Sequence, residues 1–197
     1  MSPSTPGRHM LWIDGVGSWM LCHRPTVYCG GPSQEVEDAD ICILANISRR
    51  HAAFHRLGET WMLEPLEDTS VNDVPVIEQT LLSSGDIITL ANRVRLGFRQ
   101  PSALSSTAVL DFESDHRPPY SVDGVILMAD HCLLGPGRDH HVPCNHWTET
   151  LVMFQRDDQL MCRSRGELKV NGNPVENAEP VGAGSVIDTG EFRMRIE

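Results

Sequence analysis

The sequence of 197 residues has few of the features that mark helical, secreted or membrane-spanning proteins. Lysine occurs once among 16 basic residues, and aromatic side chains make up only 6% of the chain. No stretch has a helical periodicity of useful length, which excludes a helix bundle. No apolar run reaches the roughly 18 residues that a membrane-spanning helix needs. Residues 1–9 lack the apolar run of a signal peptide, and we expect a frayed leader there.

Positive charge is also scarce. Acidic residues outnumber basic ones 27 to 16, which gives a formal net charge of −11. Both halves share the excess, because residues 1–100 hold 8 basic and 12 acidic side chains and residues 101–197 hold 8 and 15. A chain this acidic repels nucleic acid and anionic membranes unless it has a local basic patch. The sequence therefore predicts no nucleic-acid partner and no membrane partner.

Patterns for catalysis and disulfide chemistry are absent as well. There is no nucleophile elbow, no P-loop and no paired-carboxylate motif, so the sequence predicts a protein that is not an enzyme and needs no cofactor. The six cysteines form no C-x-x-C pair, and most lie in apolar runs such as Ile41-Cys42-Ile43. We expect reduced, buried thiols and a cytoplasmic location.

One loop does concentrate metal-ligating side chains. Residues 140–146 contain three imidazoles and the thiol of Cys144. Their spacing fits no closed tetrahedral site, and one short loop rarely supplies a full ligand set. We therefore predict no metal site and interpret this segment as a polar loop with Cys144 buried.

The sequence is rich in short strands. Between residues 10 and 100, about ten apolar runs alternate with turn signals. The first two runs flank Asp14-Gly15, the signature of a hairpin. Pro75 interrupts the run of residues 71–77, which suits an edge strand. An acidic loop is expected from Glu35 to Asp40. The pattern predicts an antiparallel β-sandwich, with further strands at residues 26–29, 41–44, 52–57, 60–65, 87–90 and 94–98.

The second half of the chain repeats the first. Val71-Asn72 returns as Val170-Asn171 and Gly85 returns as Gly184, in both cases 99 residues later. A constant offset over this distance predicts a second, diverged copy of the same fold. We therefore expect two tandem sandwiches, at residues 10–100 and 122–197. Residues 101–121 read as a linker whose strand-like part, residues 107–112, could belong to the second unit.

The chemically richest stretch is Ser48-Arg49-Arg50-His51. Hydroxyl and guanidinium groups are good hydrogen-bond donors to phosphate. Arg50 alternates with Arg49 and should point the other way. Taken alone, four such residues are more often a solvated basic turn than a phosphate site.

The surroundings of this stretch favour a specific resemblance. Gly30-Gly31 lies upstream, and Val71-Asn72 and Gly85-Asp86 lie downstream. In this order and spacing, residues 10 to 100 resemble the forkhead-associated (FHA) domain family, whose pattern is Gly-Arg, Ser-Arg-x-His, an Asn-Gly loop and Gly-Asp. The resemblance implies an FHA-like β-sandwich that holds phosphothreonine in loops at one end. It implies phosphopeptide binding by Ser48 and Arg49, with His51, Asn72 and Gly30 bracing the site.

Two departures from the family pattern weaken this implication. The Arg that follows Gly in the family is Gly31 here, and Gly31→Arg would restore it if the loop can hold the side chain. The Asn-Gly loop is shorter, so that Asn72 matches a later, structural Asn and the peptide-contacting Asn has no counterpart. In the second half, the positions of Ser48, Arg49 and His51 hold Trp147, Thr148 and Thr150, and no phosphate-binding set remains.

The sequence thus predicts a non-enzymatic protein-recognition module in signalling. The expected partner is a phosphorylated protein or peptide, with a Ser/Thr kinase pathway component as one candidate. The alternative is a degenerate, phosphate-independent scaffold or assembly module. Ser48 and Arg49 favour the first interpretation, and Gly31 favours the second.

Overall fold

The chain is an all-β protein, as its sequence predicts. The computed structural model describes residues 7–32 and 39–197, and these contain 22 strands and no helix. These residues therefore offer no helix that could cross a membrane. Most of the predicted leader and positions 35–38 of the predicted acidic loop lie outside the described residues. Arg8 and His9, which the sequence places in the leader, belong instead to the first strand.

The strands form three sheets. In spatial order, sheet A contains β19 (Asn173–Pro174), β18 (Lys169–Val170), β21 (Val186–Asp188), β22 (Arg193–Ile196), β1 (Arg8–Ile13), β2 (Gly17–Cys22), β13 (Gly124–Leu127), β12 (Ala108–Phe112), β11 (Val94–Arg99), β10 (Ile87–Leu90), β7 (Thr69–Val71) and β8 (Val74–Pro75). Sheet B contains β4 (Ile41–Cys42), β3 (Thr26–Gly30), β5 (Ala52–Leu57), β6 (Thr60–Pro65) and β9 (Thr80–Leu81). Sheet C contains β15 (Val142–Pro143), β14 (His131–Gly135), β16 (Leu151–Arg156), β17 (Gln159–Ser164) and β20 (Glu179–Pro180).

The first hairpin shows how closely local sequence sets local structure. β1 and β2 pair antiparallel and end with Ile13 opposite Gly17. Gly15 in the turn has a φ of 71°, a conformation that glycine adopts without a Cβ penalty. Pro75 lies in β8, at the outer edge of sheet A, where a missing N–H is tolerated.

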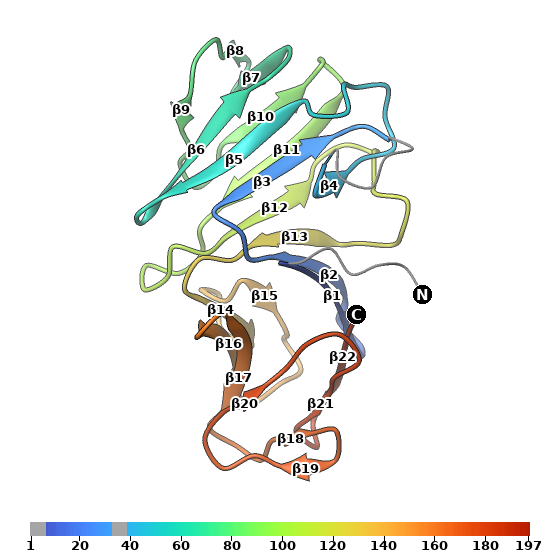
Figure 1. Cartoon of the computed structure of the whole chain (residues 1–197), viewed down its shortest axis with the longest axis vertical. Coiled ribbons are helices and arrows are strands. Elements are labelled where there is room, and N and C mark those ends of the chain that lie inside the picture. The colour runs from blue at the N-terminus through green and yellow to red at the C-terminus, as the bar shows by residue number, and fades with distance from the viewer. Residues whose placement is uncertain (1–6, 33–38) are drawn as a thin grey trace.

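The two sandwiches exchange their first hairpins. Hairpin β1–β2 does not join the strands that follow it but pairs with β22, the last strand of the chain. Hairpin β12–β13 instead pairs with β11 from the first half. Figure 1 shows the blue β1–β2 hairpin beside the red C-terminal strands and the yellow β13 at the base of the upper half. We call sheet B with β13, β12, β11, β10, β7 and β8 sandwich 1, and sheet C with β2, β1, β22, β21, β18 and β19 sandwich 2.

The exchange qualifies the expected domain boundaries. The division at residues 10–100 and 122–197, with a linker at 101–121, stays a prediction about the repeat in the sequence. In space, residues 8–22 complete sandwich 2, and β12 from the expected linker is an integral strand of sandwich 1.

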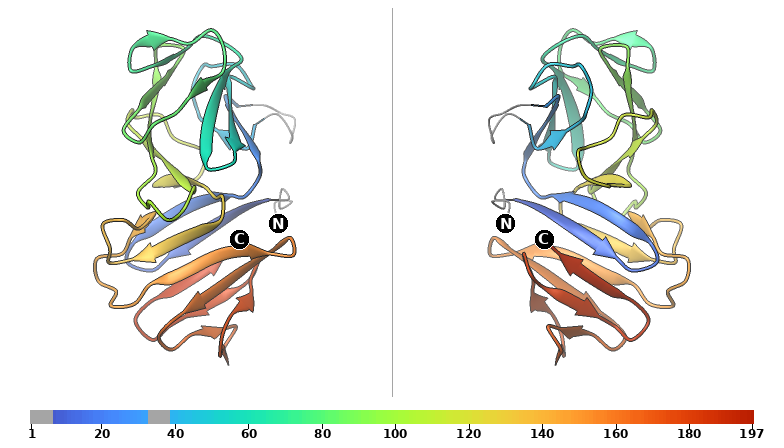
Figure 2. Two further views of the ribbon diagram at one scale, coloured as in Figure 1. Left: turned by 90° about the vertical axis from the view of Figure 1, so that its left-hand side faces the viewer. Right: turned by 90° about the vertical axis from the view of Figure 1, so that its right-hand side faces the viewer.

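A parallel pair joins the sandwiches into one sheet. β2 and β13 run parallel, with Met20 opposite Val125. Sheets B and C cover opposite faces of sheet A. Side chains that alternate along the central strands therefore enter different cores. Met20 and Val125 pack in the core of sandwich 1, whereas Leu21 packs in that of sandwich 2. Figure 2 shows the two sandwiches stacked on this common sheet. The central strands are thus buried on both faces, which ties the halves together.

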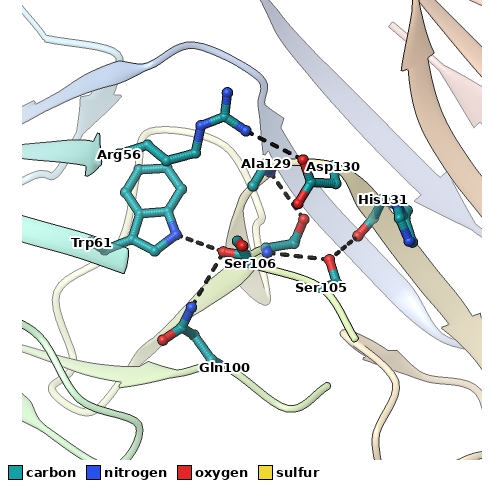
Figure 3. A network of polar contacts seen from close by, with 9 residues as sticks. Arg56, Trp61, Gln100, Ser105, Ser106, Ala129, Asp130 and His131 are labelled. Carbon is teal, nitrogen blue, oxygen red and sulfur yellow. Dashed lines mark hydrogen bonds and ion pairs between the residues drawn. The ribbon is translucent and has the colours of Figure 1, made fainter. Parts of the chain in front are cut away.

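Polar contacts reinforce the junction. The buried Trp61 donates its indole N–H to the carbonyl of Ser106 at 2.7 Å. Ser105 donates its hydroxyl to the carbonyl of His131 at 2.7 Å, and Arg56 lies 3.7 Å from Asp130 (Figure 3). These bonds link sheet B, the segment before β12 and the start of sheet C.

Candidate functional site

The candidate site is the loop of residues 43–51 between β4 and β5. The backbone of this loop lies directly on Gly30 and Gly31 at the end of β3. A Cβ added to Gly30 would lie 1.9 Å from the carbonyl oxygen of Arg49, and one added to Gly31 would lie 2.4 Å from that of Ile47. Gly31 also donates its N–H to the carbonyl of Ser48 at 2.8 Å. The two glycines therefore allow a close approach of two backbones that a side chain would prevent.

His51 connects this loop to the next one. Its side chain is buried, its Nδ1 accepts the N–H of Ser48 at 3.4 Å, and its Nε2 donates to the carbonyl of Asp68 at 2.8 Å. Its own N–H bonds the carbonyl of Cys29 at 2.8 Å. This is the geometry that a bracing role requires; the role itself stays a prediction.

The side chains on the loop differ in exposure. Ser48 is half-buried, whereas Arg49 and Arg50 are exposed. The guanidinium of Arg50 lies over the ring of Tyr28, 4.5 Å from its centroid, and a cation–π contact of this kind positions the side chain along β3. The hydroxyl of Ser48 and the guanidinium of Arg49 are thus adjacent donors at the loop end of sandwich 1.

The neighbouring loop is short and acidic. Only Leu66, Glu67 and Asp68 separate β6 from β7, and all three are exposed. The N–H groups of Leu66 and Glu67 both bond the carbonyl of His51, at 3.0 and 3.1 Å. Asp68 accepts a bond from the side-chain amide of Asn92 at 3.1 Å. This loop contains no Asn and carries two carboxylates, those of Glu67 and Asp68.

Asn72 lies apart from this group. Its side chain donates to Asp86 at 2.8 Å and accepts the N–H of Ile87 at 2.9 Å. These contacts are at the far end of β7 from Asp68, which is the residue that His51 bonds. The structure brings together Gly30, Ser48, Arg49 and His51 but places Asn72 outside the group, holding the β7–β8 turn.

Sandwich 2 has different chemistry at the matching loops. The ring of Trp147 stacks on Phe192 with centroids 3.4 Å apart. The N–H of Thr148 donates to the Glu191 carboxylate at 2.9 Å, and its hydroxyl bonds the same group. The hydroxyl bond is the main cause of the lowered pKa of Glu191. A carboxylate already occupies the place where an anion would have to bind.

Two imidazoles of the histidine-rich loop bond to groups outside it. Nε2 of His140 bonds the hydroxyl of Thr150 at 2.9 Å, and Nδ1 of His141 accepts the N–H of Leu133 at 2.9 Å. Cys144 is buried, as expected from the sequence. Among the described residues, no group of three or more His, Cys, Asp or Glu side chains is placed to hold a metal ion.

These features define a β-sandwich with a polar loop end. Residues 31–91, less than half of the chain, match the family model of the FHA domain, and this stretch is therefore similar to that family. No curated protein matches the chain. Solved FHA structures do match. One comes from a structural and functional analysis of phosphothreonine-dependent FHA domain interactions. It is 25% identical with a TM-score of 0.31, and the match covers 43% of this chain and 88% of that one. Another is the FhaA FHA domain complexed with the intracellular domain of Rv3910. It is 27% identical with a TM-score of 0.32, and the match covers 43% of this chain and 92% of that one.

Proposed function

We propose that sandwich 1 recognises a phosphothreonine on a partner protein, with Ser48 and Arg49 as the phosphate-binding residues. The protein acts by binding and not by catalysis, in the cytoplasm. A component of a Ser/Thr kinase pathway is a fitting partner, since such pathways produce phosphothreonine.

One observation supports this proposal above the others. The loop that carries Ser48 and Arg49 is anchored by the buried His51 and by the bond from Gly31, so the backbone that carries the two donors is already fixed. A backbone that is already in place loses little conformational entropy on binding.

The affinity should be modest. A charged hydrogen bond to phosphate contributes about 1.5–3 kcal/mol. Two contacts of the family pattern are missing here, at Gly31 and at the Asn of the next loop. Without these two contacts, we expect the site to bind more weakly than a complete site by on the order of a hundredfold or more.

A phosphate-independent interaction surface is the second candidate. The carboxylates of Glu67 and Asp68 next to the Ser48 loop disfavour a dianion. The tight packing of Gly31 on Ile47 also leaves no room for the missing Arg. Under this alternative, the same loops bind an unphosphorylated partner.

Calorimetric titration with a degenerate phosphothreonine peptide library separates the two candidates. Under the lead proposal, the phosphorylated library binds and its unphosphorylated counterpart does not. Arg49→Ala should then weaken binding by about 1.5–3 kcal/mol, while Arg50→Ala, which removes the same charge from the adjacent residue, should weaken it much less. Equal binding of both libraries would support the phosphate-independent surface instead.

A further inference from the structure

A second cationic site lies where the two sandwiches meet. A cavity of about 470 Å³ is lined by three arginines, namely Arg56 from β5 of sandwich 1 and Arg156 and Arg163 from sheet C of sandwich 2. Asp130, His131, Val152 and Phe154 line it too, so that one carboxylate faces the three guanidiniums. We call this the arginine cleft. Three of the chain's 16 basic residues meet here in a protein with 27 acidic ones.

The arginines of sheet C are held by an aromatic ring. The guanidinium carbons of Arg156 and Arg163 lie 5.6 and 5.5 Å from the centroid of Phe154. Strand register explains both contacts. Arg163 lies opposite Val152, which makes it the diagonal neighbour of Phe154 across the two strands. Arg156 lies two residues after Phe154 in the same strand, so the two side chains share a face. A guanidinium over a ring keeps its N–H edge available for an anion.

The positive charge of the cleft is largely uncompensated. Among the described residues, neither Arg156 nor Arg163 forms an ion pair with a carboxylate. Arg56 pairs with Asp130, but at 3.7 Å, and Asp130 is 56% exposed. A long, exposed pair of this kind is weak, so an incoming anion can take over Arg56 as its partner.

The matching face of sandwich 1 has the opposite character. By strand register, Glu64 and His55 occupy the positions of Arg163 and Phe154. These two side chains bond each other, with His55 Nε2 and Glu64 Oε2 2.6 Å apart, and Glu64 places a carboxylate where the cleft has a guanidinium. The unpaired positive charge is therefore specific to the cleft and is not a general property of this face of the fold.

We propose that the arginine cleft binds a phosphorylated side chain of an extended partner polypeptide. The two or three guanidiniums match a dianion, and Val152 and Phe154 offer an apolar floor for the flanking chain. This second site rests on the proposed function in one respect, namely that the partner protein is phosphorylated. The cleft is at the far end of β5 from the Ser48 loop, separated by roughly 13 Å of strand between residues 52 and 56.

NMR titration of the full chain tests this, with the peptide Gly-Ala-Gly-pThr-Gly-Ala-Gly as the probe. The Nε–Hε signals of Arg56, Arg156 and Arg163 should shift, and Arg156→Gln with Arg163→Gln should weaken this binding about tenfold or more. Arg193→Gln, which removes an exposed arginine elsewhere in sandwich 2, should leave it within about twofold.

Each other outcome overturns the inference. Signals that stay in place, or an unphosphorylated peptide that shifts them equally, would exclude a phosphate site. Inorganic phosphate that binds as tightly as the peptide would show that the cleft takes the free anion and not a polypeptide. Arg49→Ala keeps the two proposals apart, because it should weaken binding at the Ser48 loop and leave the cleft signals responsive.

Discussion

Asn72 and Asn171, 99 residues apart, make the same hydrogen bond. Each accepts a backbone N–H from 15 residues ahead, Ile87 in one case and Val186 in the other, both at 2.9 Å. Both have left-handed backbones, with φ of 51° and 53°. Asparagine tolerates this conformation better than most residues with a Cβ. The same turn is therefore built twice from the same chemistry.

Asn72→Ala and Asn171→Ala should each lower the free energy of unfolding by about 1–3 kcal/mol, from the lost bond and the strained backbone. Urea denaturation followed by tryptophan fluorescence measures this. Asn72→Gly separates the two causes, because it removes the bond but relieves the strain. A loss below about 0.5 kcal/mol for either alanine variant would show that the turn does not depend on this side chain.

Gly31→Arg should damage the loop and not restore a phosphate contact. Its Cβ would meet the carbonyl oxygen of Ile47 at 2.4 Å, which is backbone and cannot rotate away. We expect a loss of thermal stability, together with shifted amide signals for residues 45–49. Gly58→Arg, at a turn with no atom within 4 Å of the added Cβ, controls for the added charge, although its φ of 61° adds some strain of its own. A stable Gly31→Arg protein that binds phosphopeptide more tightly would contradict this.

A fragment of residues 1–100 should not fold on its own. It lacks β12 and β13, which complete sandwich 1, and it leaves hairpin β1–β2 without β22. A fragment of residues 24–130 contains every strand of sandwich 1 and should show far more hydrogen-exchange protection in β5 and β11. Equal protection in the two fragments would mean that the hairpin exchange contributes little to stability.

Stability should fall in mild acid because of His141. Its burial is the main cause that lowers its pKa from 6.5 to about 4. Between pH 6.5 and about pH 4, the His141 imidazole is protonated in the unfolded chain but neutral in the folded chain. The free energy of unfolding should therefore decrease through this window, by roughly 3 kcal/mol at most. His141→Asn should flatten the decrease measured by urea denaturation, whereas His146→Asn, on the exposed part of the same loop, should not.

Thiol labelling should distinguish Cys42 from the other cysteines. All six are free, and Cys42 alone is not fully buried. Burial raises the pKa of Cys22, Cys144 and Cys162 to about 12, so almost no thiolate forms at these sites near neutral pH. In native protein a thiol reagent should modify Cys42 first, and in denaturant it should modify all six. Fast native labelling of Cys22 would indicate that hairpin β1–β2 opens readily.

The strands were predictable because their signals are local. Asp14-Gly15 specifies a hairpin whatever lies around it, and Gly58-Glu59 marks the turn between β5 and β6. The exchange of hairpins was not predictable in this way. β1–β2 could pair with β11 or with β22, because both offer the same hydrogen-bonding edge. The choice between them is made by long-range packing, and no periodicity in the sequence records it.

The loop end was predictable in composition but not in geometry. Ser48, Arg49 and His51 could be singled out by type, since hydroxyl, guanidinium and imidazole groups have recognisable chemistry. The close approach of the loop to Gly30 and Gly31 could not, because a glycine pair in sequence fits a flexible turn as well as a crowded one. The arginine cleft was missed because its members come from β5, β16 and β17 and meet only through the stacking of the two sandwiches.

The pairing of the first hairpin with the last strand sets an order of events during synthesis. β1 and β2 leave the ribosome well before β22, their neighbour in sheet A, which follows roughly 170 residues later. At about 5–20 residues per second, the hairpin waits on the order of 10 to 35 s for its partner. Until sheet C has been made, its apolar face, including Leu11 and Leu21, lacks most of the core that it enters in the folded protein. Even then the outer edge of the hairpin stays open, and sandwich 2 can close only when β22 is available.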